Sequence, residues 1–328
     1  MANILMELWN LGELEVNGEP KISHERRELI FNKLKRLNIS NSEPVTPSSS
    51  SFNEPLMHNE FMPISKDDAR YYNMNHKNRG YCIIFNHNKF NGKSDSREGS
   101  TIDVNRLVKT FGNLDFDVKV YENFTCNEIM KVIKEVSQLD HTDNDCLCII
   151  TLTHGTRNDR LCARDVVYPS DKLWKPFTAD KCGTLAGKPK LFFFQACRGN
   201  ERDSGASSSA SFIQIKETAS DTAKAFDRVP IQADFLISYS TVGGYTSWRN
   251  PEKGTWYIQS LCDIFDENGT KLDVVTMMTM TTNKVAKFST INSKKELHNK
   301  MQVPEMVHRL RKLICFWPKK EQFRKKSG

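Results

Sequence analysis

The chain has 328 residues, of which 38% are hydrophobic and 27% charged, so it is long enough to bury one large core or two modest ones. It contains no apolar run near the roughly 20 residues of a membrane span, and the apolar pattern of its first residues carries acids, unlike a secretory signal. These features argue against membrane association and predict a cytoplasmic protein in which the nine cysteines are mostly free thiols.

The net charge of +7 is modest and partly concentrated in the basic C-terminal tail. No nucleic-acid-binding motif accompanies that tail, so we expect no nucleic-acid partner. Cys146 and Cys148 form a CxC pair, but no second pair of ligands follows, and we interpret both as core residues of a strand. We therefore expect no metal and no other cofactor.

Residues 1–68 differ in pattern from the rest of the chain. Leu29, Ile30 and Leu34 follow helical spacing, and the stretch EPVTPSSSS further on is typical of a linker. We expect a short, removable prosegment that is partly helical, at residues 21–37, and then disordered. A truncated interaction module is the alternative.

Strands and helices alternate from residue 80 onward, and this βαβαβ order predicts a mainly parallel sheet flanked by helices. An exposed connector, rich in Ser and Ala, is expected at 203–227 because it has too little apolar content for a core. Strands are expected at 81–85, 116–121, 146–153, 191–194, 234–239 and 301–306, and helices at 100–111 (with Ser100 as N-cap), 125–139, from Ser170, at 255–265 and at 272–287.

Cys197 follows the apolar run LFFF, which is typical of a strand buried on both faces. Open α/β sheets bind ligands in the crevice at the carboxyl ends of their strands, which is where this thiol would lie. A cysteine nucleophile needs a partner that raises its thiolate fraction. His154, 43 residues upstream, ends the preceding strand and would reach the same edge of the sheet. Gly155, without a side chain, would let its N–H and that of Cys197 form an oxyanion hole.

The segment QACRG resembles the nucleophile motif of the caspase family. The resemblance extends to GKPKLF, QADFLISYST and STVGGYTSWRNPEKGTWYIQSL, and spans residues 80–317, about three quarters of the chain. It implies a three-layer α/β sandwich with a mostly parallel six-stranded sheet and helices on both faces. It also implies a cysteine endopeptidase that cleaves after aspartate, acts as an executioner of apoptosis and is made as a zymogen.

The resemblance also implies a substrate pocket. A pocket for an aspartate side chain needs fixed cations, and the planar fork of arginine matches both carboxylate oxygens. Arg97 and Arg249 match the family's S1 arginines, with Gln195 as a third wall. Four further residues match substrate-binding positions: Ser247 beside the peptide backbone, Trp248 and Trp256 around the S2 and S4 pockets, and Asn250 near an acidic P4 residue. Together they predict a DxxD-like preference.

Activation of a caspase separates a large from a small subunit, and we expect them at residues 69–221 and 222–328. The expected cleavage sites are Asp68, with Asp67 as a competitor, and Asp221, with Asp203 and Asp227 as other candidates in the connector. Thr218 stands where an acidic P4 residue is familiar before Asp221. The implied partners are protein substrates with exposed Asp-containing loops, a second copy of the chain in a homodimer, an upstream activating caspase and inhibitor-of-apoptosis proteins.

Two alternatives remain open at this stage. An initiator-type caspase would be recruited through its N-terminal segment, and residues 1–68 alone would then bind an adaptor. A catalytically silent regulatory paralogue would usually have lost the Cys, the His or an S1 arginine, whereas all of these are present.

Overall fold

The computed structural model describes residues 70–92, 96–205 and 230–319, which belong to one compact unit. The expected prosegment helix, Asp68, Asp221 and most of the connector lie outside the described residues. Within the described ranges, no helix combines the length and apolar character needed to cross a bilayer.

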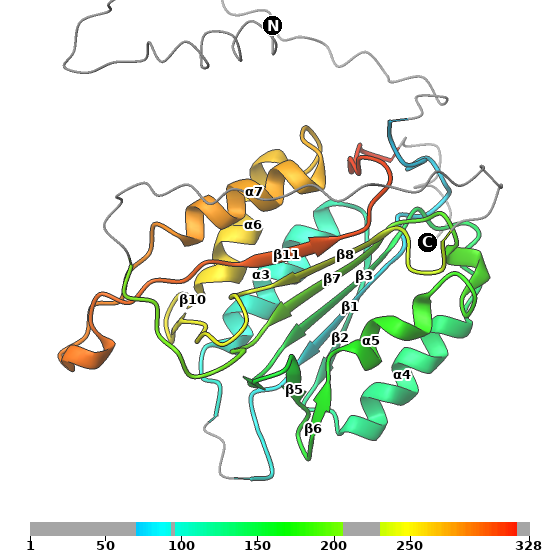
Figure 1. Cartoon of the computed structure of the whole chain (residues 1–328). Helices are drawn as coiled ribbons and strands as arrows, with labels where there is room; N and C mark the ends of the chain where they lie inside the picture. The colour runs from blue at the N-terminus through cyan, green and yellow to red at the C-terminus, as the bar shows by residue number, and fades with distance from the viewer. Residues whose placement is uncertain (1–69, 93–95, 206–229, 320–328) are drawn as a thin grey trace, which may run out of the picture. The chain divides into compact units, whose positions relative to one another are not determined.

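A six-stranded sheet forms the centre of this unit, in the order β11-β8-β7-β3-β1-β2 (Figure 1). Neighbouring strands are parallel except for β11, which is antiparallel to β8. The expected mostly parallel sheet is therefore confirmed. Its strands are β1 (Tyr81–Asn86), β2 (Asp117–Glu122), β3 (Leu147–Leu152), β7 (Lys190–Gln195), β8 (Phe235–Tyr239) and β11 (Glu305–His308).

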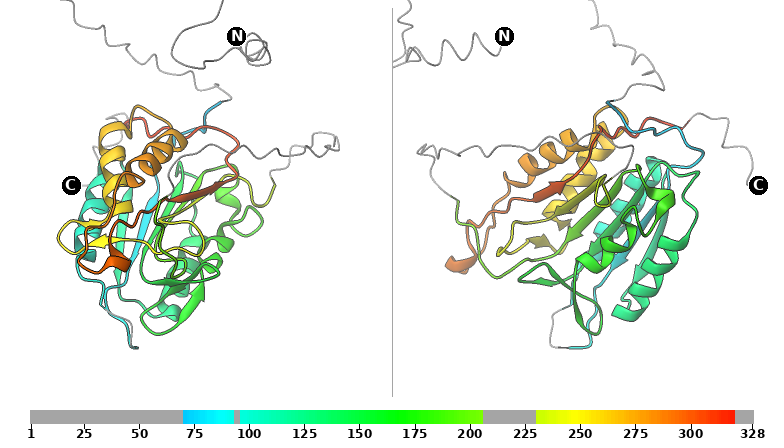
Figure 2. Two further views of the ribbon diagram at one scale, coloured as in Figure 1. Left: turned by 60° about the vertical axis from the view of Figure 1, so that its left-hand side comes forward. Right: turned by 45° about the vertical axis from the view of Figure 1, so that its right-hand side comes forward.

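Helices cover both faces of the sheet, as Figures 1 and 2 show. On one side lie α3 (Ser100–Asn113), α6 (Trp256–Asn268) and α7 (Val274–Val285), and on the other α4 (Cys126–Gln138) and the single turn α5 (Asp171–Trp174). The structure thus has the predicted three layers.

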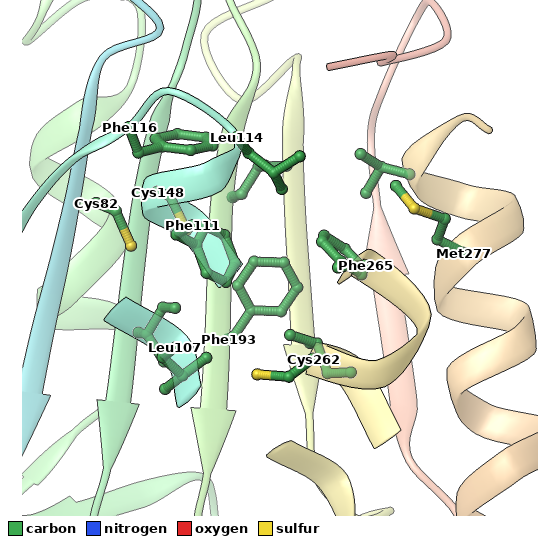
Figure 3. Close-up of a cluster of buried hydrophobic side chains, with 14 of the residues drawn as sticks. Cys82, Leu107, Phe111, Leu114, Phe116, Cys148, Phe193, Cys262, Phe265 and Met277 are labelled. Atoms are coloured by element: carbon green, nitrogen blue, oxygen red, sulfur yellow. The ribbon is translucent and has the colours of Figure 1, made fainter. Parts of the chain in front are cut away.

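Alternating side chains of the strands fill two separate cores, because successive residues of a strand point to opposite faces. In β7, Phe193 packs with Phe111 of α3, at a ring distance of 6.1 Å, and with Phe265 of α6 (Figure 3). Its neighbours Phe192 and Phe194 join the other core. Cys146 and Cys148 are fully buried in the first core, as expected for structural cysteines.

The start of α3 differs from the prediction. Its N-cap is Gly99, at φ 77°, and the Ser100 side chain makes no capping hydrogen bond. Ser100 is instead buried, and its Oγ accepts a hydrogen bond from Asn86. Gly99 is required here because a Cβ would lie 2.4 Å from the carbonyl oxygen of Pro251. The start of α4 agrees with expectation, since Thr125 forms a capping box with Glu128.

Two short elements were placed wrongly from the sequence, and the helix expected from Ser170 is confirmed but short. The last strand begins at Glu305, and Met301 forms only an isolated bridge with Asp203. The helix expected from Ser170 is a single turn, because Pro176 lies two residues after its end. The expected loop after Gly155 forms a small antiparallel sheet, too short for its periodicity to be recognised: β4 (Gly155–Thr156), β5 (Arg160–Cys162) and β6 (Val167–Pro169).

Candidate active site

His154 and Cys197 follow two strands that are direct neighbours in the sheet. Strand β3 pairs in parallel with β7, and the final pair in register is Leu152 with Gln195. Each of the two residues lies two positions beyond its strand, so the register places them at the same level of one edge. The spacing of 43 residues between them is thus the offset between the two strands.

Gly155 shows how closely the two strand ends approach. A Cβ on Gly155 would lie 2.1 Å from the carbonyl oxygen of Cys197 and 3.0 Å from the Cβ of Ala196. Such distances are too short for any side chain, so this contact requires glycine. The backbone of Gly155 therefore packs directly on the segment that carries Cys197.

Cys197 is distinguished from the other cysteines by its exposure. Of the nine, only Cys126 and Cys197 are not fully buried. The Sγ of Cys197 accepts a hydrogen bond from the backbone N–H of Ser247 at 3.4 Å and lies 3.8 Å from the carbonyl oxygen of the same residue. The segment after β8 thus lies across the thiol.

His154 is half-buried and packs on an aromatic ring that sequence reasoning missed. The ring centroids of Phe90 and His154 are 4.9 Å apart. Phe90 also stacks on a second imidazole, that of His87, with a centroid distance of 6.4 Å. Burial lowers the pKa of His87 to about 4, so this second imidazole is neutral at physiological pH. Because Phe90 packs against the imidazole of His154, it restricts the orientation of that ring.

Gln195, Ser247 and the two arginines lie around the same strand ends. Gln195 is buried, and its Nε2 donates to the hydroxyl of Ser247 at 2.8 Å. Arg97 is 2% exposed and donates from Nη1 to the carbonyl oxygen of His87. Burial, followed by the positive charge of Arg249, lowers the pKa of Arg97 to about 10. The positive charges of the two guanidinium groups therefore repel each other.

Asp103 is a further charged group that interacts with the two arginines, and sequence reasoning missed it. It lies within α3, is fully buried, and its Oδ1 accepts a hydrogen bond from the backbone N–H of Thr255 at 2.9 Å. Burial raises the pKa of Asp103 to about 6, while the hydrogen bonds of Thr255 and the charges of Arg97 and Arg249 act in the opposite direction. A single acidic residue inside a helical sequence pattern does not indicate that its side chain will be buried beside two arginines.

A model of the caspase domain family matches residues 79–314. The chain belongs to the caspase family. Caspase-1 of Spodoptera frugiperda is 44% identical over 262 residues, which cover 79% of this chain and 85% of that protein. Caspase-7 of Gallus gallus is 34% identical over 314 residues, covering 93% and 95%. The crystal structure of caspase-1 from Spodoptera frugiperda superposes with a TM-score of 0.71 at 42% identity, covering 80% of this chain and 98% of that one.

The relatives support the effector type, so this caspase is a cysteine endopeptidase with an executioner role in apoptosis, and it is made as a zymogen. Caspases act on proteins and have a dimeric organisation. Over the described part of the chain, no three His, Cys, Asp or Glu side chains are grouped as metal ligands.

The two tryptophans of the expected pocket are neighbours in this caspase. The rings of Trp248 and Trp256 lie 6.3 Å apart, and Trp256 also packs on Phe288 at 5.4 Å. The backbone N–H of Trp248 donates to Oε1 of Gln302, a buried residue that sequence reasoning missed. These contacts fix one wall of a surface beside Cys197 and Ser247.

Asn250 has a structural role that the sequence did not indicate. Its Oδ1 accepts hydrogen bonds from the backbone N–H groups of Glu252 and Lys253, at 2.8 and 3.0 Å. The side chain therefore holds the turn between β9 (Arg249–Asn250) and β10 (Gly254–Thr255). Its Nδ2, a hydrogen-bond donor, is the atom that would meet an acidic substrate side chain.

Proposed function

We propose that this caspase cleaves peptide bonds after aspartate, with Cys197 as the nucleophile and His154 as the general acid and base. The thiolate of Cys197 attacks the substrate carbonyl, and the backbone N–H groups of Gly155 and Cys197 stabilise the oxyanion. The imidazolium of His154 protonates the departing amine, and water then hydrolyses the thioester. The observation that carries this proposal is the parallel register of β3 and β7, which brings the two strand ends to one level.

The P1 aspartate would bind between Arg97 and Arg249, with Gln195 beside them. Two partly desolvated guanidinium groups in one pocket repel each other, and a carboxylate relieves that repulsion. A neutral or basic P1 side chain would bring no negative charge to the two cations. The same charges that attract aspartate thus exclude most other residues.

We extend the proposal to the P4 residue, for which Trp248 and Trp256 would form the walls and Asn250 the polar contact. Peptides of the form Asp-x-x-Asp are expected to show roughly tenfold higher kcat/KM than Ala-x-x-Asp peptides, because a charge-assisted hydrogen bond contributes about 1.5 kcal/mol. Fluorogenic tetrapeptides measure both rates.

The variant Asn250→Asp separates the P4 contact from the structural role of Asn250. It keeps the oxygen that accepts from Glu252 and Lys253, but replaces the Nδ2 donor with a second carboxylate oxygen. The preference for P4 Asp should disappear, with little change for P4 Ala. Equal rates of the wild type on the two peptides would refute the P4 proposal and leave the P1 proposal standing.

Activation would require cleavage of the connector after Asp221 and removal of the prosegment after Asp68, giving a large and a small subunit. The competing Asp203 is held in place, since its carbonyl oxygen accepts from the N–H of Met301 and its side chain from Gly205. These contacts would have to break before a protease could bind the chain at Asp203, so we favour Asp221 as the site. Mass spectrometry of the active enzyme is expected to find chains that begin at Ala69 and Thr222. Other N-termini would contradict cleavage after Asp68 and Asp221.

The partners proposed from the family are a second copy of the chain, an upstream activating caspase and inhibitor-of-apoptosis proteins, in the cytoplasm. The outermost strand β11 supports the homodimer, because an edge strand can pair with its own copy across a twofold axis.

A further inference from the structure

The hairpin of β9 and β10 carries Arg249 and packs tightly on the beginning of α3. A Cβ on Gly254, which has φ 93°, would lie 2.3 Å from Oδ1 of Asp103. At the other contact, Gly99 approaches the carbonyl oxygen of Pro251 with the same lack of space for a side chain. The hairpin therefore contacts α3 at two points, the N-cap Gly99 and Asp103 in the first turn.

Asp103 is the charged member of this contact. Its side chain is completely buried, and one oxygen, Oδ1, accepts from the N–H of Thr255 at the end of the hairpin. The other oxygen, Oδ2, is buried and has no hydrogen-bond partner among residues 70–92, 96–205 and 230–319. Burying such a carboxylate costs free energy of folding unless nearby positive charge compensates it.

That positive charge comes from the two pocket arginines. The titratable and charged groups that face Asp103 are Arg97 from the loop before α3, Arg249 from the hairpin and the thiol of Cys262 from α6. Burial raises the pKa of Cys262 to about 12, so this thiol is uncharged at neutral pH. Asp103 is thus a negative charge that interacts with two cations from different parts of the chain.

We propose that Asp103 is a positioning residue of the specificity pocket, which fastens the Arg249 hairpin to α3 and holds Arg249 beside Arg97 before the substrate arrives. This rests on the proposed role of the two arginines in binding the P1 aspartate. Asp103 does not touch the substrate; it acts through the hairpin. Without its charge, the repulsion between the arginines is uncompensated, and only the hydrogen bond with the N–H of Thr255 still joins this side chain to the hairpin.

A purely electrostatic role would have the opposite effect. If the arginines stayed in place without Asp103, the pocket would become more positive and would bind a P1 carboxylate more tightly. The direction of the change in KM therefore distinguishes positioning from simple charge compensation.

The test compares the full-length wild type with Asp103→Asn, which preserves the shape and an acceptor for Thr255 but removes the charge. Both proteins are processed by tagged wild-type enzyme that is then removed, so that processing does not depend on the activity of the variant. Asp117→Asn, a surface substitution on β2 that breaks an exposed pair with Lys119, is the matched control. We expect KM for an Asp-x-x-Asp peptide to rise at least fivefold in Asp103→Asn, with a smaller change in kcat and none in the control.

The dependence on pH provides a readout that a structural defect would not produce. Burial raises the pKa of Asp103 to about 6, so its charge is present above this pH and is lost as the pH falls through it. The protonated wild type then resembles Asp103→Asn. The wild-type advantage in kcat/KM should be full at pH 8 and shrink below pH 6, and because both proteins share His154, its titration cancels in the ratio.

The outcomes separate this inference from the proposed function. If the wild type does not prefer P1 Asp over P1 Asn, the proposed pocket itself is wrong. If it does, an unchanged or lower KM in Asp103→Asn, or a ratio independent of pH, overturns the positioning role. Should Asp103→Asn fail to fold, the pH dependence of the wild type alone decides. Between pH 8 and pH 5, the fold-increase in KM for a P1 Asp peptide must exceed the fold-decrease in the rate at which iodoacetamide alkylates Cys197. Equal fold-changes in the two quantities overturn the inference.

Discussion

Replacing Cys197 by alanine is expected to abolish peptide cleavage, lowering kcat/KM on Asp-terminated tetrapeptides by at least about 10⁴-fold. The expectation follows from covalent catalysis, because no other group at the strand ends can form the thioester, and removal of a nucleophile typically costs this much or more. The fold should be unaffected, since the Cys197 side chain is not part of either core.

Cys126→Ala is the matched control, because Cys126 is the other cysteine that is not fully buried and lies at the start of α4, in a different part of the fold. This variant should retain wild-type activity. Iodoacetamide should inactivate the wild type and Cys126→Ala alike, with mass spectrometry locating the label on Cys197. Full activity of Cys197→Ala would disprove the assignment of the nucleophile.

Removal of the Arg249 guanidinium should destroy recognition of the P1 aspartate without unfolding the protein. Arg249 is half-buried at the start of the two-residue strand β9, and its loss would leave the bound carboxylate with one cation instead of two. Truncating one partner of a desolvated charge pair costs about 2–5 kcal/mol, so Arg249→Ala should lower kcat/KM for P1 Asp by roughly 10²-fold or more. Arg249→Lys should recover part of this loss, because lysine keeps the charge but not the planar fork.

The appropriate measurement for Arg249→Ala is the ratio of rates on peptides with P1 Asp and P1 Asn, which have nearly the same shape. The ratio should be large in the wild type and approach one in the variant. Arg106→Ala serves as the control, because it removes an arginine of α3 that is paired with Asp263 of α6. A variant that still selects Asp over Asn would show that Arg249 is not part of the P1 pocket. Iodoacetamide labelling of Cys197 should proceed in the variant, which separates loss of recognition from loss of the nucleophile.

The sheet could be predicted from sequence because its central strands are buried on both faces. In β3 and β7 every residue is buried, and such continuous apolar runs are visible without knowledge of their partners. Short elements were less predictable. The small sheet of β4, β5 and β6 has strands of two or three residues, over which no periodicity can be recognised.

The sequence by itself determined the chemistry of the protein: a cysteine and a histidine at the ends of two buried strands, a glycine next to the histidine, and arginines in motifs shared with caspases. The parallel order of the strands follows from their alternation with helices. Only the tertiary structure decided that the strands pair with the same offset as the spacing of His154 and Cys197, that Phe90 packs on the imidazole, and that the Asn250 oxygen is used within its own turn. It also decided the place of Asp103, which contacts a residue 152 positions away. The physical reason is that apolar burial is recorded locally in the order of residues, whereas a single buried charge acquires its partners only when distant segments pack together.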